Sequence, residues 1–241
     1  GLLEECGIEP PALEVRATVN APNARGLGSS ATAVVAGLVA ANHWAGEPFA
    51  REQLLDRAAG AEGHPDNVTP ALFGGLTVSL LHRPRGADAR VVFRRYDPAE
   101  SVAFVVLWPD YKVSTRAARR ALPRHVAHRD AAANAQRLPL LIEALVRGEL
   151  DNLSLLIEDR LHEPYRKNLF RHYERLGRIA REAGAAGVTV SGAGPAMVAI
   201  AARNNAEQVA EAWTRQAPRD LRVTVKLMSV CGEGARLERL T

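Results

Sequence analysis

The feature that most constrains the fold is a glycine-rich turn that runs directly into a long apolar segment, "NARGLGSSATAVVAGLVAAN", at residues 23–42. The segment predicts a helix that continues to about Trp44, with Ser29 or Ser30 capping its first turn. The first turn of a helix has unpaired amide groups and a partial positive charge, and flanking glycines let the backbone approach an anion closely. The segment therefore indicates either a phosphate-binding loop or a tight turn that serves only the fold.

Length and composition set the class of protein. The 241 residues, 47% of them hydrophobic, suffice for one large globular domain or two modest ones. The longest apolar stretch, residues 31–41, is shorter than the roughly 20 residues of a membrane span, and no signal-peptide pattern opens the chain. We therefore expect a cytoplasmic protein with no membrane partner. Cys6 and Cys231 lie far apart and predict reduced thiols.

The charge pattern favours small anionic ligands over nucleic acid. The 31 basic and 27 acidic residues give a net charge of +4. The arginines are scattered along the chain, and few aromatic residues lie among them. A nucleic-acid surface usually gathers its basic residues on one face, so we expect no nucleic-acid partner.

Local patterns predict an α+β protein with two domains, residues 1–110 and 111–241. Alternation of apolar and polar residues predicts strands, and apolar residues at helical spacing predict helices. In the first domain we expect strands at 12–20, 74–81, 90–96 and 101–108, and helices at 29–44 and 51–62. In the second domain we expect helices at 115–122, 130–147, 150–161, 167–183 and 206–216, and strands on both sides of a glycine turn at 187–202 and at 221–230.

Four segments in the same order resemble motifs of the GHMP kinases. "PNARGLGSSATA" (22–33) is similar to the family's phosphate-binding motif, and "VSGAGPAMVAI" (190–200) is similar to its C-terminal glycine-rich motif. "EGHPDNVTPALFGG" (62–75) and "STRAARRALP" (114–123) resemble segments of the homoserine kinases within that family. The resemblance implies a two-domain GHMP kinase-like fold, with a mixed-sheet N-terminal domain and a ferredoxin-like α+β C-terminal domain.

The resemblance also implies a site for ATP and Mg²⁺. Its phosphate-binding residues would be Pro22, Arg25, Gly26, Leu27, Gly28, Ser29, Ser30 and Ala31. Ser30 and Glu62 would contact the metal, and oxygen ligands of this kind are those that Mg²⁺ prefers. Asp56 is the competing carboxylate if this sequence is aligned with the family motif without a gap. We favour Glu62 as the metal ligand.

In the homoserine kinases the segment that matches "HPDN" lines the amino-acid site. The resemblance therefore implies that His64 and Asp66 meet the substrate, with Asp66 accepting hydrogen bonds from its ammonium group. Asn67 falls where several relatives have a catalytic aspartate. Because an amide cannot act as a base, this implies catalysis by alignment and charge stabilisation.

Cationic residues of the second domain complete the implied substrate site. Arg119 matches the arginine expected to hold the substrate carboxylate, which a guanidinium can bind through two hydrogen bonds. Thr115, one helical turn earlier, could reach the substrate hydroxyl. Arg166 would give a second cationic contact, and the turn at 191–194, with Gly192, would pack near the phosphate loop.

The expected reaction is transfer of the ATP γ-phosphate to L-homoserine, giving O-phospho-L-homoserine for threonine synthesis. The alternatives are a GHMP kinase for another small alcohol such as mevalonate, and a non-catalytic nucleotide-binding fragment. The family's first motif, with its Gly-Pro-Gly sequence, does not occur in these 241 residues. We therefore expect a chain that begins within the first domain, and catalysis by this chain alone is in question. Relatives are often dimers, so a homodimer stays an open expectation.

Overall fold

The computed structural model describes residues 1–9, 12–86 and 88–238. The chain forms two compact units, each with its own hydrophobic core. The first unit consists of Gly1–Ala21, Gly28–Asp97 and the chain from Val230 onward, and the second of Pro22–Leu27 and Pro98–Ser229. The division after Asp97 lies earlier in the chain than the domain boundary at residue 110 that composition suggests.

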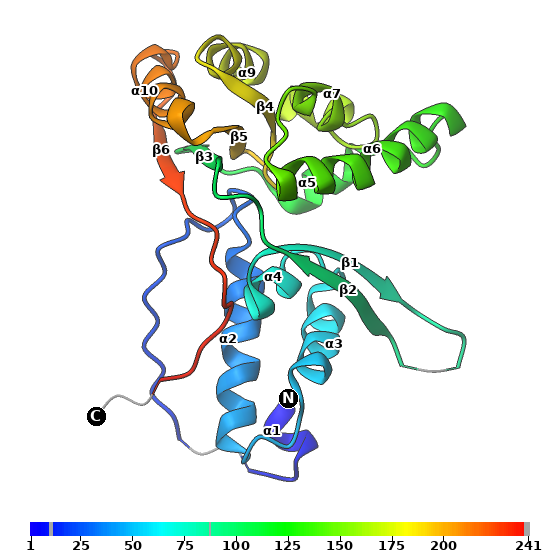
Figure 1. Cartoon of the computed structure of the whole chain (residues 1–241). Helices are drawn as coiled ribbons and strands as arrows, with labels where there is room; N and C mark the ends of the chain where they lie inside the picture. Colours follow the sequence, from blue (N-terminus) through cyan, green and yellow to red (C-terminus); the bar gives the residue numbers. More distant parts are fainter. Residues whose placement is uncertain (10–11, 87, 239–241) are drawn as a thin grey trace. The chain divides into compact units, whose positions relative to one another are not determined.

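The first unit packs helices against a two-stranded hairpin (Figure 1). Its elements are α1 (Leu2–Glu5), α2 (Ser29–Trp44), α3 (Arg51–Glu62), α4 (Val68–Phe73), β1 (Leu76–His82) and β2 (Arg90–Tyr96). The two strands are antiparallel, with Leu76 opposite Tyr96. Small residues along α2 allow α3 to approach closely, so that Val35 packs with Leu54 and Leu72 in the core.

The strand expected at residues 12–20 is wrong. This segment has no regular secondary structure, and each of its residues is exposed. Within the described parts of the chain, no strand pairs with it. Because a strand is stable only when its backbone groups bond to a neighbour, alternation in the sequence alone does not produce one.

The last described segment of the chain returns to the first unit. Gly75 donates its backbone N–H to the carbonyl of Cys231 at 2.7 Å, and Ala235 donates to the carbonyl of Leu72 at 3.2 Å. Nη2 of Arg51 in turn donates to the carbonyl of Ala235 at 2.7 Å. Residues 231–235 are therefore bonded to residues that lie about 155 to 185 positions earlier in the sequence.

The second unit contains a four-stranded antiparallel sheet with the order β4-β5-β3-β6. Its strands are β3 (Val102–Pro109), β4 (Ala185–Val190), β5 (Met197–Ala202) and β6 (Val223–Met228). The central strand β3 is largely buried, as its run of valine, leucine and phenylalanine requires. With helices between β3 and β4 and between β5 and β6, this is the ferredoxin-like βαββαβ arrangement that the resemblance implies.

Helices flank this sheet, and two of them cover one face. The helices are α5 (Thr115–Arg120), α6 (His128–Arg147), α7 (Leu153–Leu156), α8 (Glu163–Arg166), α9 (Tyr173–Glu182) and α10 (Ala206–Gln216), with 3₁₀ turns at Lys167–Leu169 and Arg203–Asn205. In Figure 1, α9 and α10 lie side by side, and Trp213 Nε1 of α10 donates to the carbonyl of Leu176 in α9 at 2.8 Å.

Two helices are shorter than the sequence patterns predict. The pattern at 150–161 yields only α7, and the pattern at 167–183 yields a helix that begins at Tyr173. Phe170 has extended backbone angles and His172 has a φ of 59°, so the chain cannot continue as one helix through these residues. The hydrophobic periodicity is present, but the backbone before α9 is not helical.

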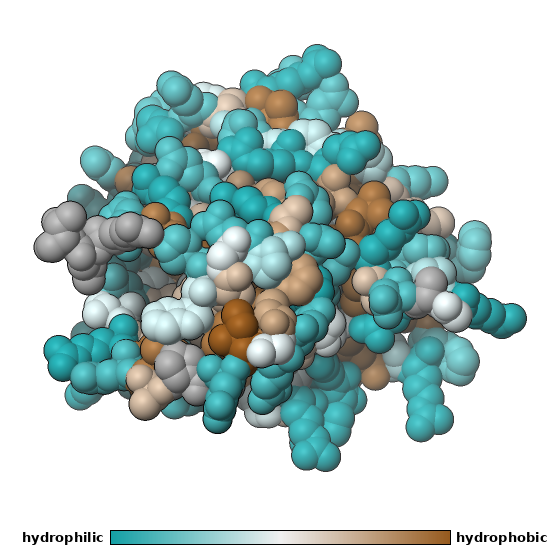
Figure 2. Space-filling model, turned by 90° about the horizontal axis from the view of Figure 1, so that it is seen from below, coloured by the Kyte–Doolittle hydropathy of each residue, from teal (hydrophilic) through white to brown (hydrophobic). Residues whose placement is uncertain are grey.

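The surface is mainly polar on one face of the molecule (Figure 2). Figure 2 shows one face covered largely by hydrophilic side chains, with apolar residues scattered among them. Across the described residues, no helix is both long enough and apolar enough to cross a membrane. Both cysteines are free, as predicted.

Gly60 offers a direct test of helix α3. It is exposed within the helix, and a β-carbon added there would meet no atom within 4 Å. We therefore expect Gly60→Ala to raise the free energy of unfolding by about 0.5–1 kcal/mol, because alanine loses less backbone entropy in a helix. Chemical denaturation would measure this change. Gly63→Ala should have the opposite sign, since Gly63 ends the helix with a φ of 82°. A lower stability of Gly60→Ala would contradict the packing around α3.

Candidate active site

The first half of the glycine-rich loop, Pro22–Leu27, is bonded to the turn between β4 and β5. Ala196 donates its N–H to the carbonyl of Arg25 at 2.9 Å, and Ser191 Oγ donates to the carbonyl of Gly26 at 2.8 Å. Gly26 has a φ of 84°, and a β-carbon there would overlap the carbonyl oxygen of Ser191. The structure thus confirms that the turn at 191–194 packs near the loop.

The side chain of Arg25 fastens the same half of the loop. Its Nε donates to the carbonyl of Pro109 at 2.7 Å and its Nη2 to the carbonyl of Asp110 at 2.5 Å, both at the end of β3. Nη1 donates to the carbonyl of Asn23 at 3.0 Å. The guanidinium is therefore bonded to protein carbonyls, and only the backbone of Arg25 remains to meet a phosphate. No pattern in the sequence indicated this role of the side chain.

The second half of the loop begins helix α2 with unpaired amides. Gly28, with a φ of 70°, occupies the position before the first helical residue, so neither serine caps the helix as expected. In residues 1–9, 12–86 and 88–238, no acceptor is bonded to any backbone N–H group from Gly26 to Ala31. Such a row of free donors at a helix start is suited to bind a phosphate.

Ser30 lies beside Glu62 rather than at the cap. Ser30 Oγ donates to Glu62 Oε1 at 2.6 Å. Asp56, the competing carboxylate, accepts the backbone N–H of Val91 at 2.6 Å and so ties α3 to β2. No group of three or more His, Cys, Asp or Glu that could hold a metal occurs among the described residues. A hydroxyl and one carboxylate still fit Mg²⁺, which usually keeps several waters and takes further oxygens from phosphates.

The "HPDN" residues form a small polar cluster at the start of α4. Asp66 Oδ1 lies 2.5 Å from His64 Nδ1 and accepts from Asn67 Nδ2 at 3.1 Å. A β-carbon on Gly28 would lie 3.2 Å from Asn67 Oδ1, so the amide is next to the loop. Asn67 and the helix start are thus close together, and Asp66 leaves one carboxylate oxygen for a further donor.

The two arginines implied for the substrate carboxylate lie near each other in the second unit. Arg166 Nε donates to the carbonyl of Ala118 at 3.2 Å, and Nη1 reaches the carbonyl of Gly192 at 3.4 Å. Burial lowers the pKa of Arg166, the opposite charge of Asp159 offsets part of this effect, and the like charge of Arg119 lowers the pKa again. An anion bound here would relieve that repulsion. Thr115, the first residue of α5, is exposed one turn before Arg119.

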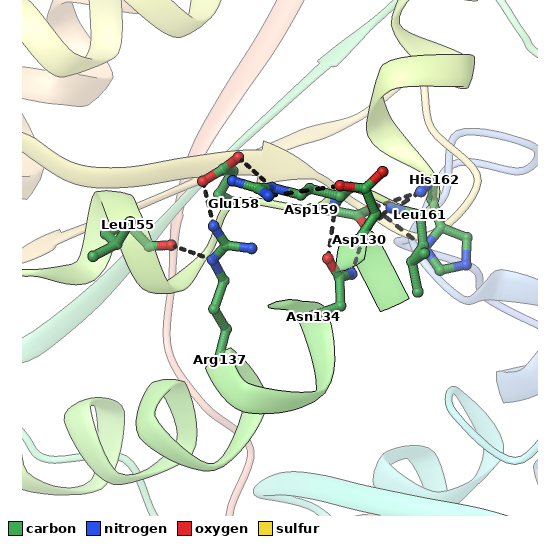
Figure 3. A network of polar contacts seen from close by, with 9 residues as sticks. Asp130, Asn134, Arg137, Leu155, Glu158, Asp159, Leu161 and His162 are labelled. Atoms are coloured by element: carbon green, nitrogen blue, oxygen red, sulfur yellow. Dashed lines mark hydrogen bonds and ion pairs between the residues drawn. The ribbon is translucent and has the colours of Figure 1, made fainter. Parts of the chain in front are cut away.

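Two further residues of the second unit escaped the sequence patterns. Asn134 of α6 and Asp159, which follows α7, form a polar network that leads to the segment containing Arg166 (Figure 3). Asp159 lies within the helix expected at 150–161, where a carboxylate reads as a solvated side chain. The proline at position 164 was the available signal, because proline is favoured in the first turn of a helix and so indicates that a new helix begins there.

Comparisons with known proteins agree with the fold and the motifs. The model of the GHMP kinases N terminal domain matches residues 1–75, and the GHMP kinases C terminal model matches residues 141–219. The homoserine kinase of Synechococcus sp. (strain CC9902) is 44% identical over 209 residues, which cover 87% of this chain and 65% of that protein. This chain therefore spans about two thirds of the length of that relative.

Two further comparisons cover more of the relative. The homoserine kinase of Synechococcus sp. (strain ATCC 27144) is 41% identical over 96% of this chain and 74% of that protein. The crystal structure of homoserine kinase from Cytophaga hutchinsonii superposes with a TM-score of 0.78 at 26% identity, over 90% of this chain and 69% of that one. With two matching family models and relatives of this identity and coverage, the chain belongs to the GHMP kinase family.

Proposed function

We propose that this chain provides the ATP site and the acceptor site of a kinase that transfers the γ-phosphate of ATP to the side-chain hydroxyl of L-homoserine, giving O-phospho-L-homoserine. The observation on which the proposal depends is the row of unpaired N–H groups from Gly26 to Ala31 at the start of α2. The names of the relatives supply the acceptor, because the loop by itself fits any nucleotide-dependent kinase of this fold.

The loop would bind the phosphates through its backbone. The N–H groups and the positive end of the α2 dipole oppose the negative charge of the triphosphate. Ser30 and Glu62 would hold Mg²⁺, which when bound neutralises phosphate charge. Because the transition state of phosphoryl transfer is loose, stabilising charge on the transferred group and fixing its direction account for most of the catalysis.

The polar residues near the loop and the two arginines suit an amino acid. The carboxylate of Asp66 can accept hydrogen bonds from an ammonium group, and the guanidinium groups of Arg119 and Arg166 can bind a carboxylate. Asn67, adjacent to Gly28, can orient a hydroxyl but cannot remove its proton. Thr115 would add a hydroxyl near the acceptor. The residues therefore favour catalysis by positioning over general-base catalysis.

The reaction itself is tested with the purified protein, Mg²⁺-ATP and candidate acceptors. We expect ADP release that depends on L-homoserine, and no release with mevalonate. Turnover of another alcohol without turnover of L-homoserine would reject the proposed acceptor. Calorimetry separates the remaining alternative, because binding of an ATP analogue with no response to L-homoserine would leave a nucleotide-binding fragment.

Arg119 provides the residue-level test of the acceptor site. Arg119→Ala should raise the KM for L-homoserine by about 10- to 100-fold and leave the KM for ATP nearly unchanged, because it removes a charged hydrogen-bond partner of the carboxylate. Arg120→Ala is the matched control, because Arg120 is the next residue of α5, is also exposed and carries the same charge. Equal increases in KM for the two variants would attribute the effect to the net charge of α5.

A further inference from the structure

The turn between α7 and α8 is folded around the carboxylate of Asp159 (Figure 3). The Asp159 side chain is only 22% exposed and accepts hydrogen bonds from three consecutive backbone N–H groups. The donors are Leu161 at 2.7 Å, His162 at 3.1 Å and Glu163 at 3.0 Å. In addition, Nδ1 of His162 lies 3.2 Å from Asp159 Oδ2. Three backbone donors on one carboxylate determine the path of the chain into α8.

A side chain of the long helix α6 holds this turn from the other side. Asn134 Nδ2 donates to Asp159 Oδ1 at 2.8 Å, and Asn134 Oδ1 accepts the backbone N–H of Arg160 at 3.0 Å. One helical turn later, Arg137 donates to Glu158 Oε2 at 2.6 Å. The amide nitrogen and the amide oxygen of Asn134 thus bond to two adjacent residues of the turn, and these bonds fix the turn relative to α6.

The turn leads directly to Arg166. Helix α8 has only four residues, Glu163–Arg166, too few to be stable without tertiary contacts. Arg166 is its last residue, and its guanidinium reaches the carbonyl of Ala118, next to Arg119. The place of Arg166 therefore depends on what anchors the beginning of α8, where the N–H of Glu163 bonds to Asp159.

We infer that Asp159, held by Asn134, is a positioning residue that fixes α8 so that Arg166 meets the carboxylate of the acceptor. The role in acceptor binding rests on the function proposed above, whereas the anchoring of α8 does not. Asp159 has no contact with the substrate in this scheme. It acts through the backbone of residues 161–163.

The protonation state of Asp159 agrees with this role. Burial alone would raise its pKa, but the hydrogen bonds from the His162 ring, from the Leu161 N–H and from Asn134 outweigh burial and hold the pKa well below its ordinary value. The stabilisation by the carboxylate is thus complete above the ordinary aspartate pKa of about 3.9 and is lost as the pH falls from there through the lowered pKa. At neutral pH the turn is held by an ionised group.

The test replaces Asp159 by asparagine, which keeps its size but turns one oxygen into a donor that faces other donors. We expect Asp159→Asn to raise the KM for L-homoserine about tenfold and to change the KM for ATP less than about twofold. Asp130→Asn is the matched control. Asp130 pairs with Arg160 at 3.6 Å in the same network, and its carboxylate is not among the acceptors of the amides at 161–163. The KM values of Asp130→Asn for L-homoserine and for ATP should stay at the wild-type level.

Two more measurements separate positioning from a general loss of structure. Amide hydrogen exchange over residues 160–169 should become faster in Asp159→Asn and not in Asp130→Asn, and this readout needs no enzymatic activity. The double variant Asn134→Asp with Asp159→Asn restores one donor–acceptor pair, so its KM for L-homoserine should lie between those of Asp159→Asn and the wild type.

Unchanged exchange at 160–169 would overturn the anchoring of α8, as would a parallel increase in the KM values for L-homoserine and ATP. Faster exchange with an unchanged KM for L-homoserine would overturn the role in acceptor binding. A wild-type protein that does not phosphorylate L-homoserine would instead reject the proposed function, leaving the exchange result to decide the anchoring.

Discussion

Replacing Gly26 by alanine should disable the phosphate loop and lower the free energy of unfolding by about 2 kcal/mol or more. The added β-carbon would overlap the carbonyl oxygen of Ser191 and lie 2.9 Å from the backbone nitrogen of Gly194. Both obstacles are backbone atoms, which cannot turn aside as a flexible side chain can. The loop must therefore separate from the turn at 191–194. We expect the KM for ATP to rise by at least about tenfold, measured together with a denaturation curve.

Gly46 is the matched control for Gly26. Its φ of 83° is nearly the same as the 84° of Gly26, but a β-carbon on Gly46 would meet no atom within 4 Å. Gly46→Ala therefore carries only the cost of a positive φ, about 1 kcal/mol, and should leave the KM for ATP unchanged. If the two variants lost the same stability and the same ATP affinity, the close contact between the loop and Ser191 would have no energetic importance.

Glu62→Gln should reduce kcat/KM by about 100-fold or more at low Mg²⁺, and kcat/KM should recover in part as the Mg²⁺ concentration is raised. Glutamine retains the shape of glutamate and can still accept the hydrogen bond from Ser30 Oγ, which is 2.6 Å long here. What it lacks is the negative charge that a divalent cation requires. A titration of activity against Mg²⁺ would measure the shift in the concentration needed for half-maximal rate.

Asp56→Asn distinguishes the two carboxylates that the motif leaves open. Asp56 accepts the N–H of Val91, and an asparagine can still accept this bond through its amide oxygen. The variant should therefore keep nearly the wild-type stability and leave the dependence on Mg²⁺ unchanged. A shift of the Mg²⁺ requirement in Asp56→Asn, with none in Glu62→Gln, would reverse the assignment of the metal ligand.

Elements with strong local patterns were predicted to the residue. The helix expected at 51–62 is α3, and the strand expected at 90–96 is β2. The segment at 12–20 failed because a strand is completed by a neighbour, and alternation in one segment says nothing about whether a partner lies beside it. The helix expected at 150–161 is only α7, which ends at Leu156, and the N–H groups of Leu161 and Glu163 bond to the side chain of Asp159 instead of to helical carbonyls.

The candidate site likewise contains residues that a local sequence pattern marks and residues that no local pattern marks. The phosphate loop could be recognised because glycines at a helix start are local, and the structure gives Gly26 and Gly28 the positive φ that explains them. The residues that hold the site could not be recognised. Arg25 bonds to a carbonyl 84 positions away, and Asn134 bonds to Asp159 across 25 positions. No local pattern marks such pairs, since each residue alone is an ordinary polar side chain.

The return of residues 231–235 to the first unit has a consequence for how the protein is made. Leu72 and Gly75 are translated well before their partners, because the backbone groups that bond them follow about 160 residues later. During this interval Pro98–Ser229, the main part of the second unit, is synthesised and can begin to fold. The part of the chain that is made first is therefore finished last, and a ribosome that stalls before residue 231 would release a first unit with this edge unbonded.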